Sequence, residues 1–124
     1  MLTLRIVGVL YLLSGLWCAL KPELAAPFLG YQVGGLGLAE IVAVYGGLQL
    51  GIAAGMIATT FKPDWVLPGL VFALCISLGL ALLRVLGIVL YDAGEQAAGL
   101  YMMALLEWAF VVALALAFRR GRMA

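Results

Sequence analysis

Four long apolar runs constrain the fold of this chain more than any other feature. They cover residues 3–20, 38–60, 66–91 and 99–118. A helix needs about 20 mainly apolar residues to cross a bilayer, so each run is long enough to span. The runs are continuous rather than alternating, which excludes a transmembrane β-barrel. We therefore predict an all-α fold in one domain, residues 1–124, that forms an integral membrane bundle of four transmembrane helices.

The composition indicates that lipid is the main partner of the protein and covers most of its surface. Hydrophobic residues make up 67% of the chain and charged residues 10%, whereas soluble domains are about 45–50% apolar and about 25% charged. Net charge is +1 without a basic block, so no nucleic-acid partner is expected. The chain has no histidine, and its two cysteines, Cys18 and Cys75, show no CxxC spacing. We therefore expect no metal and no cofactor.

The connections between the runs differ in length. The two turns at 61–65 and 92–96 are short, and the second is acidic. The link between the first two runs is longer and contains Pro22, Pro27 and Gly30. Proline suits the first position of a helix and glycine suits its end. We predict a short interfacial helix over residues 22–29, between spans 1 and 2.

Positive charges are unevenly divided between the two sides of this topology. With four spans, both termini and the 61–65 turn share one side, which carries Arg5, Lys62, Arg119, Arg120 and Arg122. The other side carries only Lys21. Cytoplasmic loops carry an excess of lysine and arginine. We therefore expect a multi-pass protein of the bacterial inner membrane with cytoplasmic N- and C-termini.

Small residues at four-residue spacing mark candidate packing surfaces. Lipid-embedded helices associate through close packing and interhelical hydrogen bonds, and small side chains allow that approach. Such ridges occur on the second and fourth spans, at Gly47, Gly51 and Gly55 and at Ala109, Ala113 and Ala117. Ala73, Ser77, Ala81 and Arg84 share one face of the third span.

Several polar residues lie inside the membrane. Arg84 and Glu107 are each placed well inside a span, about 10 Å and about 12 Å from the same side at 1.5 Å per residue. Since a lone charge in lipid is costly and these helices are consecutive, we predict that the two pair. Tyr45 and Gln49 share one face of the second span at similar depth, and Glu40 lies on another face near its mouth. These five residues form the predicted intramembrane polar site.

Two interpretations of this polar set stay open. In the first, Arg84 and Glu107 are an interhelical clamp that fixes the register of two spans. In the second, the set lines a polar cavity open to the non-cytoplasmic side and able to bind a proton, an ion or a small ligand, with Glu40 as an excess acid. Neither interpretation assigns a catalytic residue.

Several segments resemble a known family. Residues 37–40 and 43–51 read GLAE and AVYGGLQLG, and residues 20–22 and 28–30 read LKP and FLG. Residues 79–84 and 104–107 read GLALLR and ALLE. Together they resemble the small four-span bacterial membrane proteins of domain-of-unknown-function family 4345, over nearly the whole chain. The resemblance implies a four-helix membrane fold and no particular activity.

Three functions fit these features. The first is an accessory subunit that packs against a larger membrane complex or against itself, because the chain shows no soluble domain or catalytic motif. The second is a small transporter or binder of a lipophilic or ionic ligand. Small multidrug transporters have a similar length and four spans, but their essential glutamate lies in the first helix, where this chain has no acid. An enzyme acting on a lipid or quinone ranks last.

Overall fold

The structure, a computed structural model, describes residues 1–91 and 98–123. Four of its helical segments are long and apolar enough to cross a membrane. They are α1 (Leu2–Leu20), a continuous second span (Gly35–Phe61), α5 (Pro63–Tyr91) and α6 (Ala98–Met123). The predicted all-α, multi-pass bundle is confirmed, and the spans begin and end within a few residues of the predicted positions. The predicted acidic turn at 92–96 lies outside the described residues.

The second span changes its helical type along its length. It consists of α3 (Gly35–Glu40), the π-helical segment η1 (Ile41–Leu48), α4 (Gln49–Ala58) and the short 3₁₀ segment η2 (Thr59–Phe61). Hydrogen bonding thus continues from one end to the other, as lipid requires of a spanning backbone. π-Helical turns are rare and occur frequently at functional sites. The π-helical segment is therefore the first structural pointer to a site in this chain.

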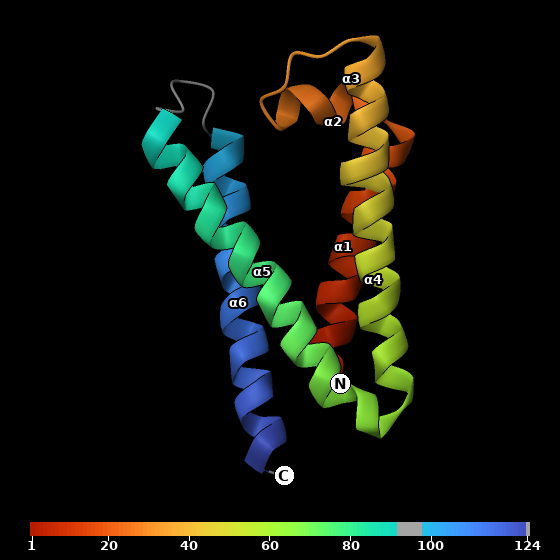
Figure 1. Ribbon diagram of the computed structural model, residues 1–124, viewed down its shortest axis with the longest axis vertical. Coiled ribbons are helices and arrows are strands. Elements are labelled where there is room, and N and C mark those ends of the chain that lie inside the picture. Colours follow the sequence, from red (N-terminus) through yellow and green to blue (C-terminus); the bar gives the residue numbers. More distant parts are fainter. Residues whose placement is uncertain (92–97, 124) are drawn as a thin grey trace.

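The predicted interfacial helix is α2 (Pro22–Phe28). Pro22 opens it, and Gly30 follows it with a φ of 84°. Glycine adopts this left-handed conformation without steric cost, which explains how the chain turns back toward the second span. In Figure 1, α2 lies across the end of the bundle opposite the two termini. We call this end the α2 end and the opposite one the terminal end.

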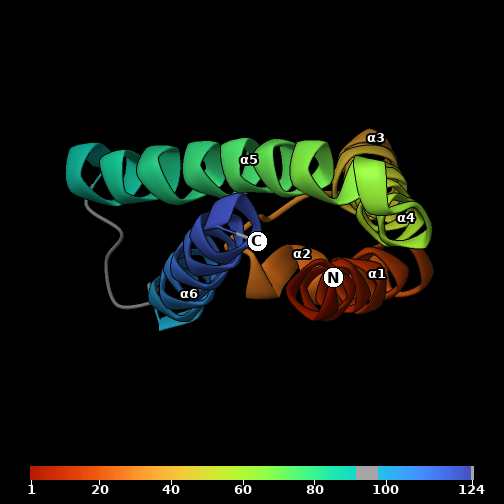
Figure 2. The ribbon, with the colours of Figure 1, turned by 90° about the horizontal axis from the view of Figure 1, so that it is seen from below.

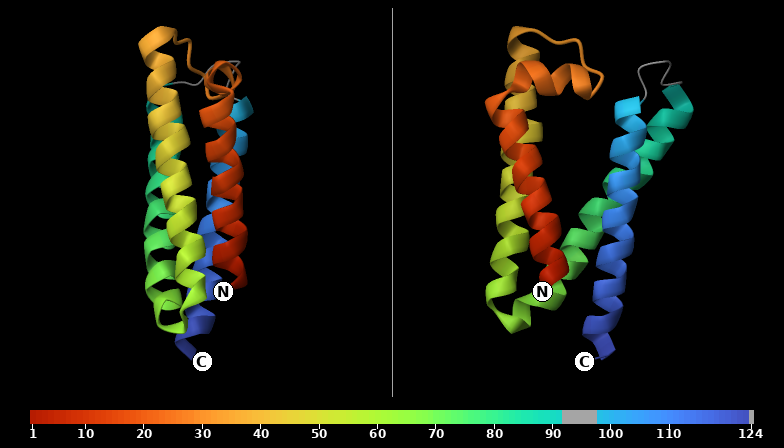
Figure 3. Two further views of the ribbon diagram at one scale, coloured as in Figure 1. Left: turned by 90° about the vertical axis from the view of Figure 1, so that its right-hand side faces the viewer. Right: turned by 180° about the vertical axis from the view of Figure 1, so that it is seen from behind.

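The four spans form two pairs. The helix α1 packs along the second span, and α5 packs along α6. Figures 1 and 3 show that the pairs converge at the terminal end and diverge toward the α2 end. Seen from below in Figure 2, α5 begins beside α4 and leans away from it. The tilt of α5 therefore separates the pairs at one end only.

Apolar residues from all four spans meet toward the terminal end. The cluster is made of Leu4, Val7, Tyr11, Ala53, Met56, Leu70, Ala73, Phe110 and Leu114. Each of these side chains is buried. Among the described residues, a second buried cluster at the α2 end consists of Cys18, Ala25, Ala26, Leu29 and Ile41, none of which belongs to α5 or α6. The two pairs are thus joined firmly at one end.

Glycines allow close approach between α1 and the second span, but not the predicted ones. A Cβ on Gly46 would lie 2.9 Å from the Ala19 Cβ, and one on Gly15 would lie 3.1 Å from the Gly46 carbonyl oxygen. By contrast, a Cβ on Gly51 or Gly55 would meet nothing within 4 Å. The structure differs here from the predicted ridge, because the Gly47–Gly51 face points away from α1. That face packs against no described helix of this chain.

The contact between α5 and α6 uses small residues on one side only. On α5 the predicted face is buried, with Ala73, Ser77 and Ala81 all fully inaccessible. On α6 the buried positions are Ala104, Glu107, Phe110 and Leu114, whereas Ala109 is exposed and Ala113 and Ala117 are half-buried. Of the predicted alanine ridge, Ala117 packs against the core cluster, whereas Ala109 is exposed. Because the α5 side chains at this contact are small, larger side chains of α6 can pack against them.

Candidate functional site

An ion pair joins α5 to α6 within the membrane-spanning region. Arg84 donates from Nε to Glu107 Oε2 over 2.8 Å and from Nη2 to Glu107 Oε1 over 2.7 Å. The side chains are 19% and 6% exposed, respectively. Such a bidentate contact fixes geometry as well as charge. The predicted pairing of Arg84 with Glu107 is confirmed.

A cavity of about 130 Å³ lies beside this ion pair, between the two helix pairs. Its walls come from α1, the second span, α5 and α6, and from the residue that follows α2. The lining is mostly apolar and consists of Leu10, Tyr11, Ser14, Cys18, Leu29, Tyr45, Gln49, Leu80, Arg84, Met103, Leu106, Glu107 and Phe110. The cavity therefore occupies the region where the pairs begin to diverge.

The second span contributes two polar side chains to the cavity, as their shared face predicted. Tyr45 lies within the π-helical segment, and Gln49 begins α4 directly after it. The Gln49 Oε1 atom is buried and has no hydrogen-bond partner among the described residues. An unpaired buried amide group costs free energy, which makes Gln49 available to a ligand.

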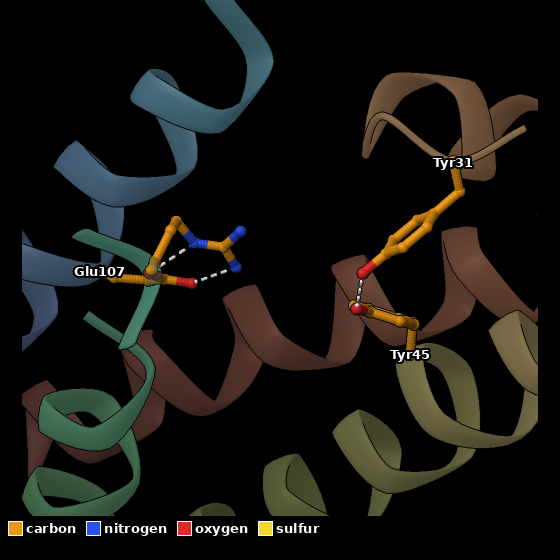
Figure 4. Close-up of polar contacts among 4 residues, drawn as sticks. Tyr31, Tyr45 and Glu107 are labelled. Carbon is orange, nitrogen blue, oxygen red and sulfur yellow. Dashed lines mark hydrogen bonds and ion pairs between the residues drawn. The ribbon is translucent and has the colours of Figure 1, made fainter. Parts of the chain in front are cut away.

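A tyrosine pair lies on the α2 side of the site. The hydroxyls of Tyr31 and Tyr45 are 2.5 Å apart, and either can be the donor. Figure 4 shows Tyr31 reaching down from the segment after α2 to Tyr45, with Glu107 on the far side of the site. The rings are 5.7 Å apart between centroids. This contact ties the loop after α2 to the wall of the cavity.

Glu40 takes no part in the cavity. It ends α3, its side chain is exposed, and it is not among the residues that line the space. It shares the outward face of the second span with Val44, Gly47 and Gly51, which are also exposed. The structure thus brings together Tyr45, Gln49, Arg84 and Glu107 but separates Glu40 from them. The predicted excess acid lies outside the site.

The sequence interpretation missed the contribution of α1. Tyr11, Ser14 and Cys18 all line the cavity, and Tyr11 and Cys18 are buried. Their spacing of three and four residues places them on one helical face. That pattern was readable in the sequence, but α1 carries no acidic residue and therefore drew no attention as a polar wall.

The site combines one ion pair with a mostly apolar lining. Arg84 and Glu107 are the two charged side chains of the lining, and they neutralise each other. Within residues 1–91 and 98–123, no group of three or more His, Cys, Asp or Glu side chains could hold a metal ion. Pockets that bind small molecules are mostly apolar with a few well-placed polar groups. The lining of this cavity has that composition.

Comparisons with protein-family models, with curated proteins and with solved structures find no match to this chain.

Proposed function

We propose that this multi-pass membrane protein binds a small amphiphilic molecule in the cavity between its two helix pairs. The observation that carries the proposal is the coincidence of a mostly apolar space with polar side chains at its wall, among them Tyr45, Gln49, Arg84 and Glu107. Polar and charged residues are costly in a membrane and tend to mark ligand pathways. A molecule with an apolar body and a polar group matches both parts of this wall.

The Arg84–Glu107 pair acts in this proposal as both a clamp and a wall of the site. Its two hydrogen bonds hold α5 against α6. The same guanidinium group lines the cavity. A clamp alone would not need the polar side chains of the second span. Tyr45 and Gln49 line the same cavity as the ion pair without a hydrogen bond to it. The binding function explains why these groups converge.

Filling the cavity tests this proposal. Ser14→Leu places a larger side chain in the cavity lining and so reduces the free space. Cys75→Leu places the same side chain at an exposed position on α5. We expect p-cresol to raise the unfolding temperature of the native protein and of Cys75→Leu in detergent, but not that of Ser14→Leu. A ligand at one hundred times its Kd stabilises by about 2.7 kcal/mol. Equal effects on all three proteins would refute the proposal, because they would show that p-cresol does not bind in this cavity.

We also propose that the protein lies in the bacterial inner membrane with cytoplasmic termini. Both termini lie at the same end of the bundle (Figure 1). The excess of lysine and arginine in the terminal segments and the 61–65 turn supports this orientation. Membership of domain-of-unknown-function family 4345 is part of the same proposal and rests on the sequence motif around Tyr45. A reporter enzyme that works only in the periplasm can be fused to the C-terminus. Activity of that fusion would overturn the orientation.

A second candidate function is that of an accessory subunit, packing against a larger membrane complex or against a second copy. The observation that favours it is the outward face of the second span, where Gly47 and Gly51 are exposed. A helix from another chain could approach such a face closely. Co-purification of a partner in mild detergent, lost in Gly51→Leu but not in Gly79→Leu, would support this role. A monomer in both proteins would contradict it.

A further inference from the structure

The cavity wall is electrically neutral, which bears on the charge of its ligand. Within the described part of the chain, Arg84 and Glu107 are its two charged residues, and both oxygens of the carboxylate are engaged by the guanidinium group. A charged ligand would therefore find no uncompensated counter-ion. Burying a charge without a partner is far more costly than burying a neutral polar group. The wall favours an uncharged molecule.

Gln49 and Arg84 each keep a polar group open to such a molecule. Gln49 Oε1 is buried without a partner among the described residues. Arg84 uses Nε and Nη2 for Glu107, so its Nη1 makes no hydrogen bond within the described part of the chain. The first group accepts a hydrogen bond and the second donates one. A hydroxyl group both donates and accepts, so it can satisfy Gln49 whichever way the amide is turned, and it can also accept from Arg84.

The size of the space limits the body of the ligand. The cavity measures about 130 Å³. An apolar protein cavity of about 150 Å³ is large enough to bind benzene. The apolar lining from Leu10, Leu80, Met103 and Phe110 suits a flat hydrocarbon body. A single ring or a short chain fits this space.

The side of α5 that faces the lipid offers a route to the cavity. Leu80 and Arg84 line the cavity, and they also line a hollow on the surface of α5 together with Gly79 and Leu83. Leu83 is 69% exposed, and a Cβ on Gly79 would meet nothing within 4 Å. Leu80 and Arg84 are thus shared by the walls of the hollow and of the cavity. A molecule dissolved in the bilayer can approach the site sideways.

We infer that the cavity takes an uncharged molecule that bears a hydroxyl group on a body about the size of one aromatic ring, and that this molecule arrives from the bilayer past Leu80 and Arg84. The inference rests on the proposed binding function and adds to it the charge, polar group and size of the ligand. It selects between the lipophilic and the ionic ligand, in favour of a lipophilic one that carries a hydroxyl.

Four aromatic compounds of similar size test the inference: p-cresol, toluene, benzoate and benzylammonium. Their dissociation constants are measured by thermal shift on the purified protein in detergent, at matched concentrations in the micelle. We expect p-cresol to bind about threefold to tenfold more tightly than toluene, the range that one hydrogen bond supplies. We expect the two ions to bind more weakly than either neutral compound.

Substitution of Gln49 provides the control for the polar group. In Gln49→Leu, p-cresol should lose its advantage while toluene binds as in the native protein. Gln49→Met serves as a second variant if the first does not fold. Equal binding of p-cresol and toluene to the native protein, or tighter binding of either ion, would overturn the inference and leave the proposed binding function standing. Binding of none of the four compounds would overturn the binding function itself.

Discussion

The two ends of this bundle are built differently. At the terminal end, one apolar cluster takes residues from all four spans, including the fully buried Leu4 and Leu114. At the α2 end, the smaller cluster around Cys18 and Ala25 draws only on α1, on residues 25, 26 and 29 of the α2 region and on the start of the second span. There the two pairs diverge, as the right-hand view of Figure 3 shows.

This difference separates what holds the protein together from what it can bind. A close-packed interior loses contacts wherever a space opens, so a bundle cannot be tight and hollow at the same place. The terminal end closes the bundle, and the cavity begins where that packing ends. Because core and cavity lie at different ends, α2 and the loop after it could move and change the cavity without disrupting the core.

The ion pair should show the largest effect, because losing either partner leaves a charge unpaired in a largely buried position. Removing one partner of a buried pair costs about 3–5 kcal/mol, since the other charge is left unpaired. We expect Arg84→Leu and Glu107→Leu each to lower the free energy of unfolding by that amount, and the double variant to recover much of the loss. Chemical denaturation in detergent measures all three. Arg119→Leu, at an exposed position, serves as the control.

Additive losses in Arg84→Leu and Glu107→Leu would show that the two residues do not act as a pair. A stable double variant that no longer binds p-cresol would show in addition that the pair is part of the binding wall. That result would show that stability and binding can be lost separately, as the contrast between the two ends of the bundle implies.

A core substitution tests the terminal end directly. Leu114 is fully buried in the cluster shared by the four spans, whereas Leu116 on the same helix is 49% exposed. Leu→Ala changes in cores cost about 2–5 kcal/mol. We expect Leu114→Ala to fall in that range, Leu116→Ala to be near neutral and Leu29→Ala, at the α2 end, to lie between them. If Leu29→Ala were as destabilising as Leu114→Ala, the contrast between the ends would fail.

The glycine contact between α1 and the second span should give a smaller effect. Gly46→Ala places a Cβ 2.9 Å from the Ala19 Cβ, so the helices must move apart. Overpacking of this kind costs about 1–3 kcal/mol. Gly51→Ala, with open space around it, should change the unfolding free energy little. Equal losses in the two variants would mean that the predicted Gly47–Gly55 ridge carries helix packing after all.

The sequence predicted the spans, the interfacial helix and the Arg84–Glu107 pair because each follows from local rules. Apolar length identifies a span, and two costly charges at equal depth favour a pair. The packing surfaces could not be predicted in the same way. Glycine and alanine are common throughout these helices, and which face of the second span meets α1 depends on the tilt and register of the whole bundle. Gly8 and Gly15 of α1, two helical turns apart, are the glycines that indicate the close contact with the second span.

The cavity was predicted only in part, for a related reason. Tyr45 and Gln49 were assigned to one face, and the structure turns that face toward the space. Glu40 was grouped with them by depth alone, although its helical face differs. The walls supplied by α1 and by Leu29 depend on where the pairs diverge, which no short segment encodes. Tertiary geometry therefore decided which polar residues share the site.

The smallest expected effect concerns the tyrosine pair at the α2 end. Tyr31 and Tyr45 share one hydrogen bond, and both rings are partly accessible. A hydrogen bond of this kind contributes about 0.5–1.5 kcal/mol. Tyr45→Phe should therefore leave global unfolding nearly unchanged, because the terminal core is untouched. It should instead loosen the loop after α2, which begins at Leu29, a residue that packs in one cluster with the buried Cys18.

Thiol labelling measures that loosening. In a Cys75→Ala background, Cys18 is the single cysteine, and its reaction with methyl methanethiosulfonate reports opening at the α2 end. A loss of about 1 kcal/mol raises the open population roughly fivefold, so Tyr45→Phe should speed labelling by a comparable factor. Tyr31→Phe should have the same effect, and the double variant should add nothing, since both remove one shared bond. Tyr101→Phe, on α6, should leave the rate unchanged. Additive effects of the two substitutions would show that the hydroxyls act separately, and the α2 end would then be closed by the packing of Leu29 and Ala25 alone.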